Sequence, residues 1–338
     1  MVAACPPAGE PSEAVLEVRG LRTWFEADGA VVKAVDGVDL AVSRGECVAL
    51  VGESGCGKSV TALSVMRLVP SPPGKTVGGR ILFKGRDLVQ CTDAEIRELR
   101  GNDISMIFQE PMTALNPVFT VGYQVAEVIR AHQRLRARAA RRKALEVLEM
   151  VGVPDVEERY HAYPHELSVG LRQRIMIAMA LACRPSVLVA DEPTTALDVT
   201  IQAQILDLLA RLQQDLGMAT LLITHDLGVV AGMCDRVMVM YAGRIVEEAS
   251  TRDLYASPSH PYTKALLESV PRLDEHGHAR LQSIEGLPPR LDRGAFDACT
   301  FAPRCTLARD ACRAGEPPLE AFAPGRRRRC VLTPEEVL

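Results

Sequence analysis

The sequence lacks a hydrophobic run long enough to cross a membrane. A helix that spans a bilayer needs roughly 18 to 20 apolar residues, whereas the longest apolar run here covers residues 175–183. A strong charge of either sign is also missing, because 39 Lys and Arg oppose 43 Asp and Glu and leave a formal net charge of -4. We therefore expect a chain that does not cross the membrane itself and does not bind nucleic acid.

We expect no export signal in this chain. The residues Met1-Val2-Ala3-Ala4-Cys5 superficially resemble a lipoprotein cleavage site, but no charged segment or apolar core stands before Cys5. We expect residues 1–14 to form a disordered polar leader. Without an export signal, the ten cysteines are expected in a reducing compartment, where disulfides are the weaker explanation for them.

Length and composition are those of a globular protein. Of the 338 residues, 47% are hydrophobic and 24% are charged. This length is enough for about two domains. We expect an α/β domain at residues 15–250 and a proline-rich, loop-like region at residues 251–338.

A G-x-x-x-x-G-K-S stretch at residues 52–59 follows an apolar strand pattern and precedes a predicted helix at residues 60–68. In this setting, a P-loop closes its backbone N–H groups around phosphate oxygens, and the helix points its positive end at the same anions. Lys58 is expected to reach the β- and γ-phosphates and Ser59 to hold Mg²⁺. The expected nucleotide-binding residues of the loop are Gly52, Ser54, Gly55, Cys56, Gly57, Lys58, Ser59 and Val60.

Short strands are predicted before the P-loop, at residues 16–19, 23–25 and 31–35, and they indicate an antiparallel sheet beside it. An aromatic side chain here can stack on a nucleotide base, and we choose Phe25, with Trp24 second. Spacing alone favours the alternative that both rings fill the core of the small sheet.

Two adjacent carboxylates end a buried strand pattern at residues 187–193. Asp191 can bind Mg²⁺ and Glu192 can polarise an attacking water, which is the division of labour that phosphoanhydride hydrolysis needs.

Two further strand patterns end in polar side chains. Gln109 follows residues 104–108, and an amide at this position can reach a bound metal or water. His225 follows residues 221–224 and can hydrogen-bond a terminal phosphate. Taken alone, His225 is an ordinary strand-end residue, but it follows other nucleotide-site elements.

Helical patterns occupy the middle of the chain. Residues 121–151 are rich in arginine, and we interpret them as the solvated face of an amphipathic helix and not as a nucleic-acid patch. Residues 167–174 open another helix that runs to Ala182. Ser168 is its predicted N-cap and leaves the next amides free to receive an anion.

The order of these elements resembles the ATP-binding cassette (ABC) ATPases. The motifs that carry the resemblance are Walker A (residues 52–59), the Q-loop (Gln109), the signature (residues 167–173), Walker B (residues 187–192), the D-loop (residues 196–198) and the switch histidine (His225). Residues 109–117, residues 190–200 and the extension that begins Ser259-His260-Pro261-Tyr262-Thr263 look like the peptide/nickel importer branch.

The resemblance implies an α/β cassette with a RecA-like core, an antiparallel β subdomain, a helical subdomain at about residues 112–182 and a small C-terminal domain. It implies ATP and Mg²⁺ as ligands, with Mg²⁺ held by Ser59, Gln109 and Asp191. Glu192 is the implied general base, with Gln109 and His225 at the γ-phosphate. The residues that complete the opposite site of a cassette pair are Ser168, Gly170 and Asp198.

The implied protein is the motor subunit of a binding-protein-dependent importer, on the cytoplasmic face of the membrane. Its partners are a second, related but distinct ATPase subunit, two membrane permease subunits and, indirectly, a solute-binding protein. Dipeptides, longer peptides, nickel complexes and other small solutes all stay open as cargo.

One residue departs from the family pattern. Val169 stands where the signature normally has the first of two glycines. A β-branched residue is costly there if the position needs a positive φ, but it costs little as the first helical residue after Ser168. We favour the helical geometry, and whether Val169 impairs the composite site stays open.

Four cysteines gather near the C-terminus with the spacing C-x₅-C-x₆-C-x₁₇-C: Cys299, Cys305, Cys312 and Cys330. This is not the paired C-x₂-C spacing of ordinary zinc modules, and spacing alone leaves metal binding and free thiols equally open. The resemblance suggests a [4Fe–4S] cluster, with Zn²⁺ as the alternative, in a structural or redox-sensing role. We interpret the arginines at 326–329 as a solvated charge run.

Two other functions are less well supported. Soluble cassette ATPases of translation or DNA repair usually carry two cassettes or a long coiled-coil insertion, and residues 58–167 have room for neither. A redox sensor without enzymatic activity does not explain the full set of hydrolytic residues.

Overall fold

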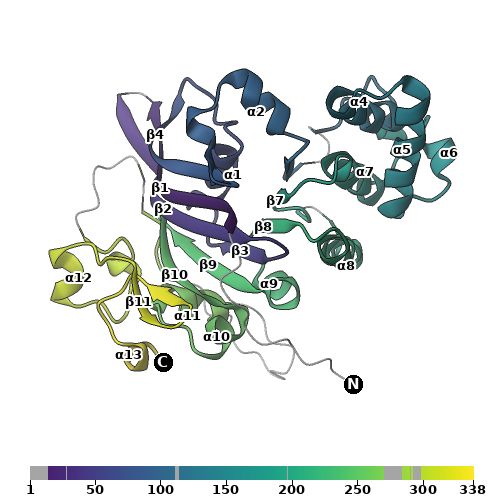
Figure 1. Cartoon of the computed structure of the whole chain (residues 1–338). Coiled ribbons are helices and arrows are strands. Elements are labelled where there is room, and N and C mark those ends of the chain that lie inside the picture. Colours follow the sequence, from purple (N-terminus) through teal and green to yellow (C-terminus); the bar gives the residue numbers. More distant parts are fainter. Residues whose placement is uncertain are drawn as a thin grey trace.

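Two β-sheets form the core of the chain (Figure 1), and the computed structural model describes residues 14–27, 29–110, 114–195, 197–269, 284–289, 291 and 298–338. The smaller sheet has the strand order β2-β1-β4-β5, and its neighbouring strands run antiparallel. The predicted antiparallel sheet is therefore confirmed. Its strands are β1 (Ala14–Ala27), β2 (Ala30–Ser43), β4 (Gly74–Phe83) and β5 (Arg86–Asp87).

The first two predicted strands, at residues 16–19 and 23–25, are parts of the single strand β1. Gly20 lies between them with a left-handed φ of 56°, and the pairing with β2 shifts register between Val18 and Leu21. The chain thus passes Gly20 as a bulge. The predicted break is wrong because β1 pairs on both sides, and this outweighs the local preference of glycine.

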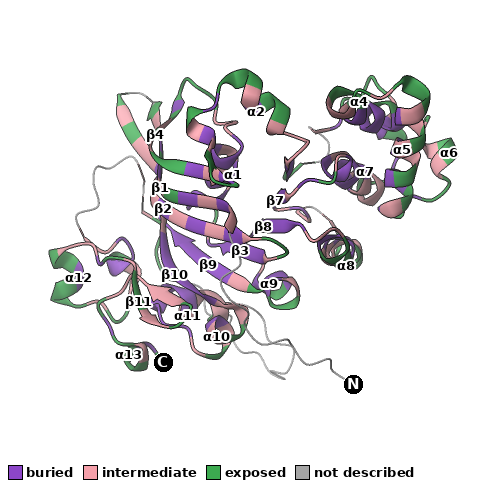
Figure 2. Ribbon diagram, in the orientation of Figure 1, coloured by how far each residue is buried: buried purple, intermediate pink, exposed green. Residues whose placement is uncertain are grey.

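The larger sheet has the strand order β11-β12-β10-β9-β3-β8-β7-β6. Its strands from β9 to β6 pair in parallel, and three antiparallel strands extend it beyond β9. The central strands are buried (Figure 2), as their apolar runs predict. Its strands are β3 (Cys47–Val51), β6 (Ile104–Ile107), β7 (Val187–Asp191), β8 (Ala219–Thr224), β9 (Arg236–Tyr241), β10 (Arg244–Ser250), β11 (Glu320–Ala323) and β12 (Arg326–Arg328).

The helices pack around the sheets, and α4 to α7 form a group at one side (Figure 1). None of the helices in the described part of the chain is both long and apolar enough to span a membrane. The α-helices are α1 (Lys58–Val65), α2 (Asp93–Leu99), α4 (Val121–Gln133), α5 (Ala137–Met150), α6 (Val156–Arg159), α7 (Val169–Leu181), α8 (Val199–Leu216), α9 (Leu227–Met233), α10 (Thr251–Ala256), α11 (Pro261–Glu268), α12 (Asp310–Ala314) and α13 (Pro334–Val337). Short 3₁₀ turns are η1 (Leu88–Gln90), η2 (Pro164–Glu166) and η3 (Ala302–Arg304).

The predicted helix start at Ser168 is confirmed, because Ser168 Oγ accepts a hydrogen bond from the N–H of Leu171 at the start of α7. In the same way, the side chain of Thr92 caps α2. The single helix predicted at residues 121–151 is instead two helices, because Arg134 adopts a left-handed φ of 51° between them. The predicted start of the helical subdomain, at about residue 112, lies outside the described residues.

The C-terminal arginines belong to the larger sheet. Arg326, Arg327 and Arg328 form β12, which pairs with β10, and Arg327 Nη1 lies 3.1 Å from Glu248 Oε2. Arg329 donates a hydrogen bond to the carbonyl oxygen of Ile245 at 3.0 Å. The predicted solvated charge run is therefore wrong, because strand pairing and neighbouring acceptors hold these residues.

A buried carboxylate joins β10 to the segment that follows α10. Glu247 is 0% exposed, and its Oε1 accepts hydrogen bonds from the N–H of Ser259, at 2.8 Å, and from its hydroxyl, at 2.7 Å. Oε2 accepts one from the N–H of His260 at 2.9 Å. Burial raises the pKa of Glu247, and these hydrogen bonds oppose the rise.

Replacing this carboxylate is expected to destabilise the protein. Glu247→Ala leaves the buried N–H groups of Ser259 and His260 without acceptors, so we expect a loss of about 3 kcal/mol in the free energy of unfolding. Chemical denaturation measures it. The control is Glu157→Ala, which removes a carboxylate that is 67% exposed in its pair with Arg141 and should cost no more than about 0.5 kcal/mol. Equal losses in the two variants would contradict the assignment.

Candidate functional site

The P-loop, residues 52–59, joins the end of β3 to the start of α1. Gly57 lies there with a left-handed φ of 109°, and a Cβ atom on it would lie 2.2 Å from the carbonyl oxygen of Ala34. A Cβ atom on Gly52 would lie 2.2 Å from the carbonyl oxygen of Met240. The loop therefore packs directly against the backbone of β2 and β9, which requires glycine at both positions.

The side chain of Lys58 folds back into this loop. Its Nζ donates hydrogen bonds to the carbonyl oxygens of Gly52, at 2.7 Å, and Glu53, at 3.0 Å. Lys58 is only 4% exposed, and it is the first residue of α1. An ammonium group and a helix N-terminus together favour an anion such as a phosphate chain.

Ser59 and Asp191 bring two oxygen ligands together at the edge of the larger sheet. Ser59 Oγ donates a hydrogen bond to Asp191 Oδ1 at 3.0 Å. They meet because β3 and β7 both pair in parallel with β8, so their carboxyl ends lie at one edge. Burial raises the pKa of Asp191, and the hydrogen bond from Ser59 opposes the rise. A hydroxyl and a carboxylate are ligands that suit Mg²⁺ in a nucleotide site, so the pair fits the predicted ion.

Glu192 is the point where the other polar residues of this edge converge. Its Oε2 accepts hydrogen bonds from Gln109 Nε2, at 3.0 Å, and Thr195 Oγ1, at 2.9 Å, and its Oε1 lies 3.3 Å from His225 Nδ1. Glu192 also adopts a left-handed φ of 46°, a strained conformation that is common at functional sites. The carboxylate is thus held in one orientation by three neighbours.

The predicted signature and D-loop residues form a second group. Ser168 and Asp198 are the N-caps of α7 and α8, and a Cβ atom on Gly170 would lie 3.0 Å from Ile201 of α8. Val169 is the first residue of α7 and is 45% exposed, so the helical geometry is the one observed. Among the described residues, no hydrogen bond or ion pair joins Ser168, Gly170 or Asp198 to the P-loop. Ala196 of the D-loop lies outside the described residues.

Phe25 and Trp24 lie near the end of β1. The half-buried ring of Phe25 packs beside Gly74, where a Cβ atom would lie 2.7 Å from Phe25 Cε1. Lys33 Nζ lies 5.0 Å from the centre of the Trp24 ring. These contacts do not test the stacking of Phe25 on a nucleotide base, which stays a prediction.

The four C-terminal cysteines lie near one another in the structure. The N–H of Cys299 donates to the carbonyl oxygen of Cys312 at 2.9 Å, and burial raises the pKa of the Cys299 thiol to about 11. Burial also raises the pKa of Cys305 and Cys330. Among the described residues, no three His, Cys, Asp or Glu side chains are grouped closely enough to hold a metal ion. The structure therefore does not support the predicted cluster.

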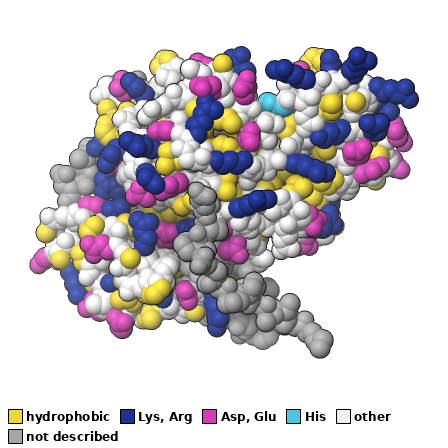
Figure 3. Space-filling view, viewed as in Figure 1, with side chains coloured by type: hydrophobic (Ala, Val, Ile, Leu, Met, Phe, Trp, Pro, Cys, Tyr) yellow, Lys and Arg dark blue, Asp and Glu magenta, His cyan; other side chains and the backbone are white. Residues whose placement is uncertain are grey.

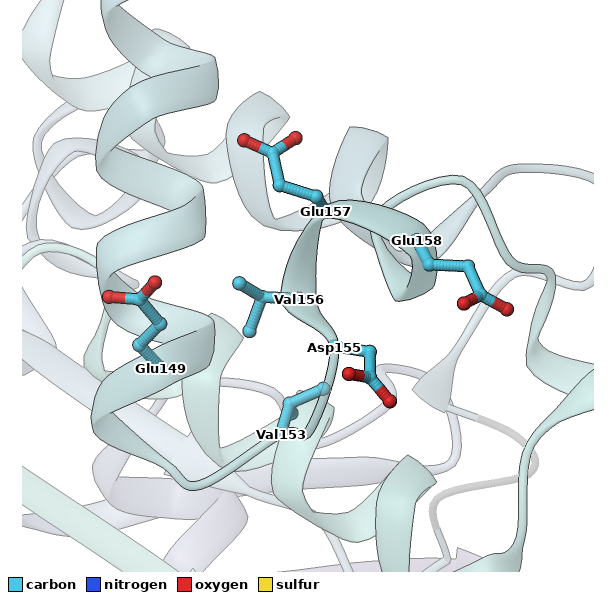
Figure 4. A pocket seen from close by; sticks show the side chains of 6 residues that line it. All are labelled: Glu149, Val153, Asp155, Val156, Glu157 and Glu158. Carbon is cyan, nitrogen blue, oxygen red and sulfur yellow. The ribbon is translucent and has the colours of Figure 1, made fainter.

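A hollow in the helical group is distinct from the P-loop site (Figure 4). Four acidic side chains surround two valines there, on α5, on α6 and in the turn between them. Clustered carboxylates repel phosphate groups, so this hollow is no alternative nucleotide site. Its lining residues are Glu149, Val153, Asp155, Val156, Glu157 and Glu158.

Sequence reasoning did not identify three residues near the site. Thr195 donates to Glu192, whereas Tyr262 and Arg304 reach the P-loop residue Glu53 from the C-terminal region. Thr195 and Tyr262 stand in segments that resemble the importer branch, residues 190–200 and the extension that begins at Ser259, and this signal could have drawn attention to them.

Comparison with known proteins finds two family models that match separate parts of the chain. A family model described as ABC transporter matches residues 35–195. A second, described as Oligopeptide/dipeptide transporter, C-terminal region, matches residues 246–312. Among solved structures, a dimeric ATP-binding cassette in a post-hydrolysis state bound to ADP and Pi aligns with a TM-score of 0.63 and 27% identity, over 70% of this chain and 99% of that chain.

Whole-chain relatives agree with these matches. The oligopeptide transport ATP-binding protein AppD of Bacillus subtilis is 50% identical over 322 residues, which are 95% of this chain and 98% of AppD. The dipeptide transport ATP-binding protein DppD of the same species is 54% identical over 293 residues, 87% of each chain. The predicted family is confirmed: the chain belongs to the ATP-binding proteins of the ABC transporter family, in the branch that carries the oligopeptide/dipeptide transporter C-terminal region.

Proposed function

We propose that the chain is the ATP-hydrolysing motor subunit of an importer for dipeptides or oligopeptides. The observation that carries this proposal is the convergence of Gln109, Thr195 and His225 on the carboxylate of Glu192, beside the P-loop. Peptide cargo rests on the names of AppD and DppD together with the matching C-terminal region. A nickel or other small-solute importer is the alternative.

Each residue of the site has a role in this proposal. Lys58 and the P-loop amides bind the phosphate chain, and Ser59, Gln109 and Asp191 would hold Mg²⁺. When bound, the ion neutralises charge on the phosphate oxygens. Glu192 accepts a proton from the water that attacks the γ-phosphate in line with the leaving oxygen, and Gln109 and His225 orient the reacting groups. Phe25 stacks on the base.

Removing the proposed general base should separate binding from hydrolysis. Glu192→Gln keeps the size of the side chain but cannot accept the proton, so we expect ATP binding near the wild-type level and a loss of hydrolysis of about a hundredfold or more. Nucleotide affinity and phosphate release measure the two effects. The control is Glu157→Gln in the acidic hollow, which should hydrolyse ATP normally. Hydrolysis by Glu192→Gln at the rate of that control would assign the base elsewhere.

Pairing with a second cassette is part of the proposal. The exposed residues Ser168, Val169 and Asp198, with the half-buried Gly170, offer helix N-termini to the phosphate chain in the partner's site, and a solved relative of the fold is dimeric. We propose a related but distinct ATPase as the partner, so that the pair is a heterodimer.

Two permease subunits are the proposed membrane partners, at the junction between the core and the helical group. A mostly apolar cavity of about 260 Å³ lies there, lined by residues that include Met66, Phe108 and Met176. Nearby, Phe119 and Tyr123 stack at 5.0 Å and are 43% and 41% exposed. Hydrophobic side chains gather along this junction (Figure 3), and such a groove suits the apolar face of a short helix.

The transport proposal predicts that cargo controls hydrolysis in the assembled importer. ATPase activity of this chain with its permease and ATPase partners should rise severalfold when the solute-binding protein carries peptide, because cargo-dependent closure brings the two cassettes together. Binding protein loaded with nickel complexes is the comparison. Stimulation by nickel complexes alone would favour the alternative cargo. The importer proposal would be contradicted by an ATPase rate that no loaded binding protein changes, together with a lack of association with permeases.

The four-cysteine cofactor is the least supported part of the prediction, and no step of the proposed mechanism depends on it. If four thiolates hold an iron–sulfur cluster, anaerobic purification should give about four iron and four acid-labile sulfide per chain. Cys305→Ser should lower both, whereas Cys183→Ser, a partly exposed cysteine of the helical part, should change neither. A colourless chain with zinc or with no metal would rule out the cluster.

A further inference from the structure

A tyrosine of the C-terminal region holds the backbone of the P-loop. Tyr262 Oη accepts a hydrogen bond from the N–H of Glu53 at 2.9 Å. Tyr262 is 0% exposed, and its ring packs against those of Tyr241, at 4.6 Å between centroids, and Phe301, at 5.3 Å. Because two aromatic rings pack against this side chain, its hydroxyl offers the loop an acceptor at a defined place.

An arginine of the same region holds the side chain of the same loop residue. Arg304 Nη1 donates to Glu53 Oε2 at 2.6 Å, and Nη2 donates to Oε1 at 3.0 Å. The pair is therefore bidentate, the strongest geometry for this kind of contact. The Arg304 side chain is 5% exposed and that of Glu53 is 26% exposed, so water screens the pair far less than a surface ion pair.

Glu53 links these contacts to Lys58, whose ammonium group is the proposed phosphate-binding group. It is the second residue of the P-loop, and the carbonyl oxygens of Gly52 and Glu53 are the two that accept hydrogen bonds from Lys58 Nζ. Tyr262 fixes the N–H of Glu53 and Arg304 fixes its carboxylate, so the peptide groups on either side of Glu53 cannot rotate freely. The position of the Lys58 ammonium depends on those same peptide groups.

We propose that Tyr262 and Arg304 are positioning residues of the nucleotide site, which act through Glu53 and make the C-terminal region a determinant of ATP affinity. The inference rests on the proposed function, because it assigns a role in nucleotide binding to contacts outside the cassette motifs. A merely structural contact between the C-terminal region and the core would support folding but would leave the affinity for ATP unchanged.

The first experiment compares Arg304→Ala, Arg304→Lys and Glu53→Gln in the full chain. Loss of the bidentate pair frees Glu53, so Arg304→Ala and Glu53→Gln should each raise the KM for ATP in the assembled importer about tenfold, with kcat within about twofold. Arg304→Lys keeps the charge and one hydrogen bond and should recover part of the affinity. A fluorescent ATP analogue gives the same ranking by direct binding to the chain alone.

The matched control is Arg309→Ala, which breaks an ion pair of the same region with Glu336 that does not contact the P-loop. It should leave KM and kcat at the wild-type values. The double variant Arg304→Ala with Glu53→Gln should bind ATP as weakly as either single variant, because both changes remove one interaction.

Two results would overturn the inference. Arg304→Ala and Glu53→Gln could unfold at lower temperature yet keep the wild-type KM, or Arg309→Ala could raise KM as much as they do. Should Arg304→Ala not fold, Arg304→Lys and Glu53→Gln decide the question by the same KM comparison. A wild-type chain that binds no nucleotide would instead overturn the proposed function itself.

Discussion

The parallel pairing of β3, β8 and β7 is the constraint on which the candidate site depends. It brings the carboxyl ends of these strands to one edge of the larger sheet, where Ser59, Glu192 and His225 follow them. Residues far apart in the sequence thereby come within hydrogen-bond distance. A shift of one residue in the register of β7 would turn Asp191 away from Ser59, so the site and the core are fixed by the same ladder of hydrogen bonds.

Much of this arrangement follows from local sequence signals. The glycines of the P-loop, the apolar strands that end in Asp191 and Gln109, and the cap Ser168 each act within a few residues of themselves. Their physical requirements can therefore be recognised without the rest of the chain. The same holds for the first residue of α7, because Val169 follows a capping serine.

The features that sequence reasoning missed depend on distant partners. Gly20 does not end a strand, because β1 is paired on both sides. The arginines of β12 are only partly exposed, because they pair with β10 and with an acidic side chain of that strand. Tyr262 and Arg304 meet Glu53 across 209 and 251 positions of the chain. Periodicity and propensity contain no information about such contacts, and only the assembled sheet reveals them.

The C-terminal region is joined to the core by more than its chain connection. It adds β11 and β12 to the larger sheet, and it supplies the guanidinium that neutralises Glu53. The region is consequently not an interchangeable module. A chimaeric subunit that takes this region from another protein must also take a basic partner for Glu53. Otherwise an unpaired carboxylate stands next to the loop that binds phosphate.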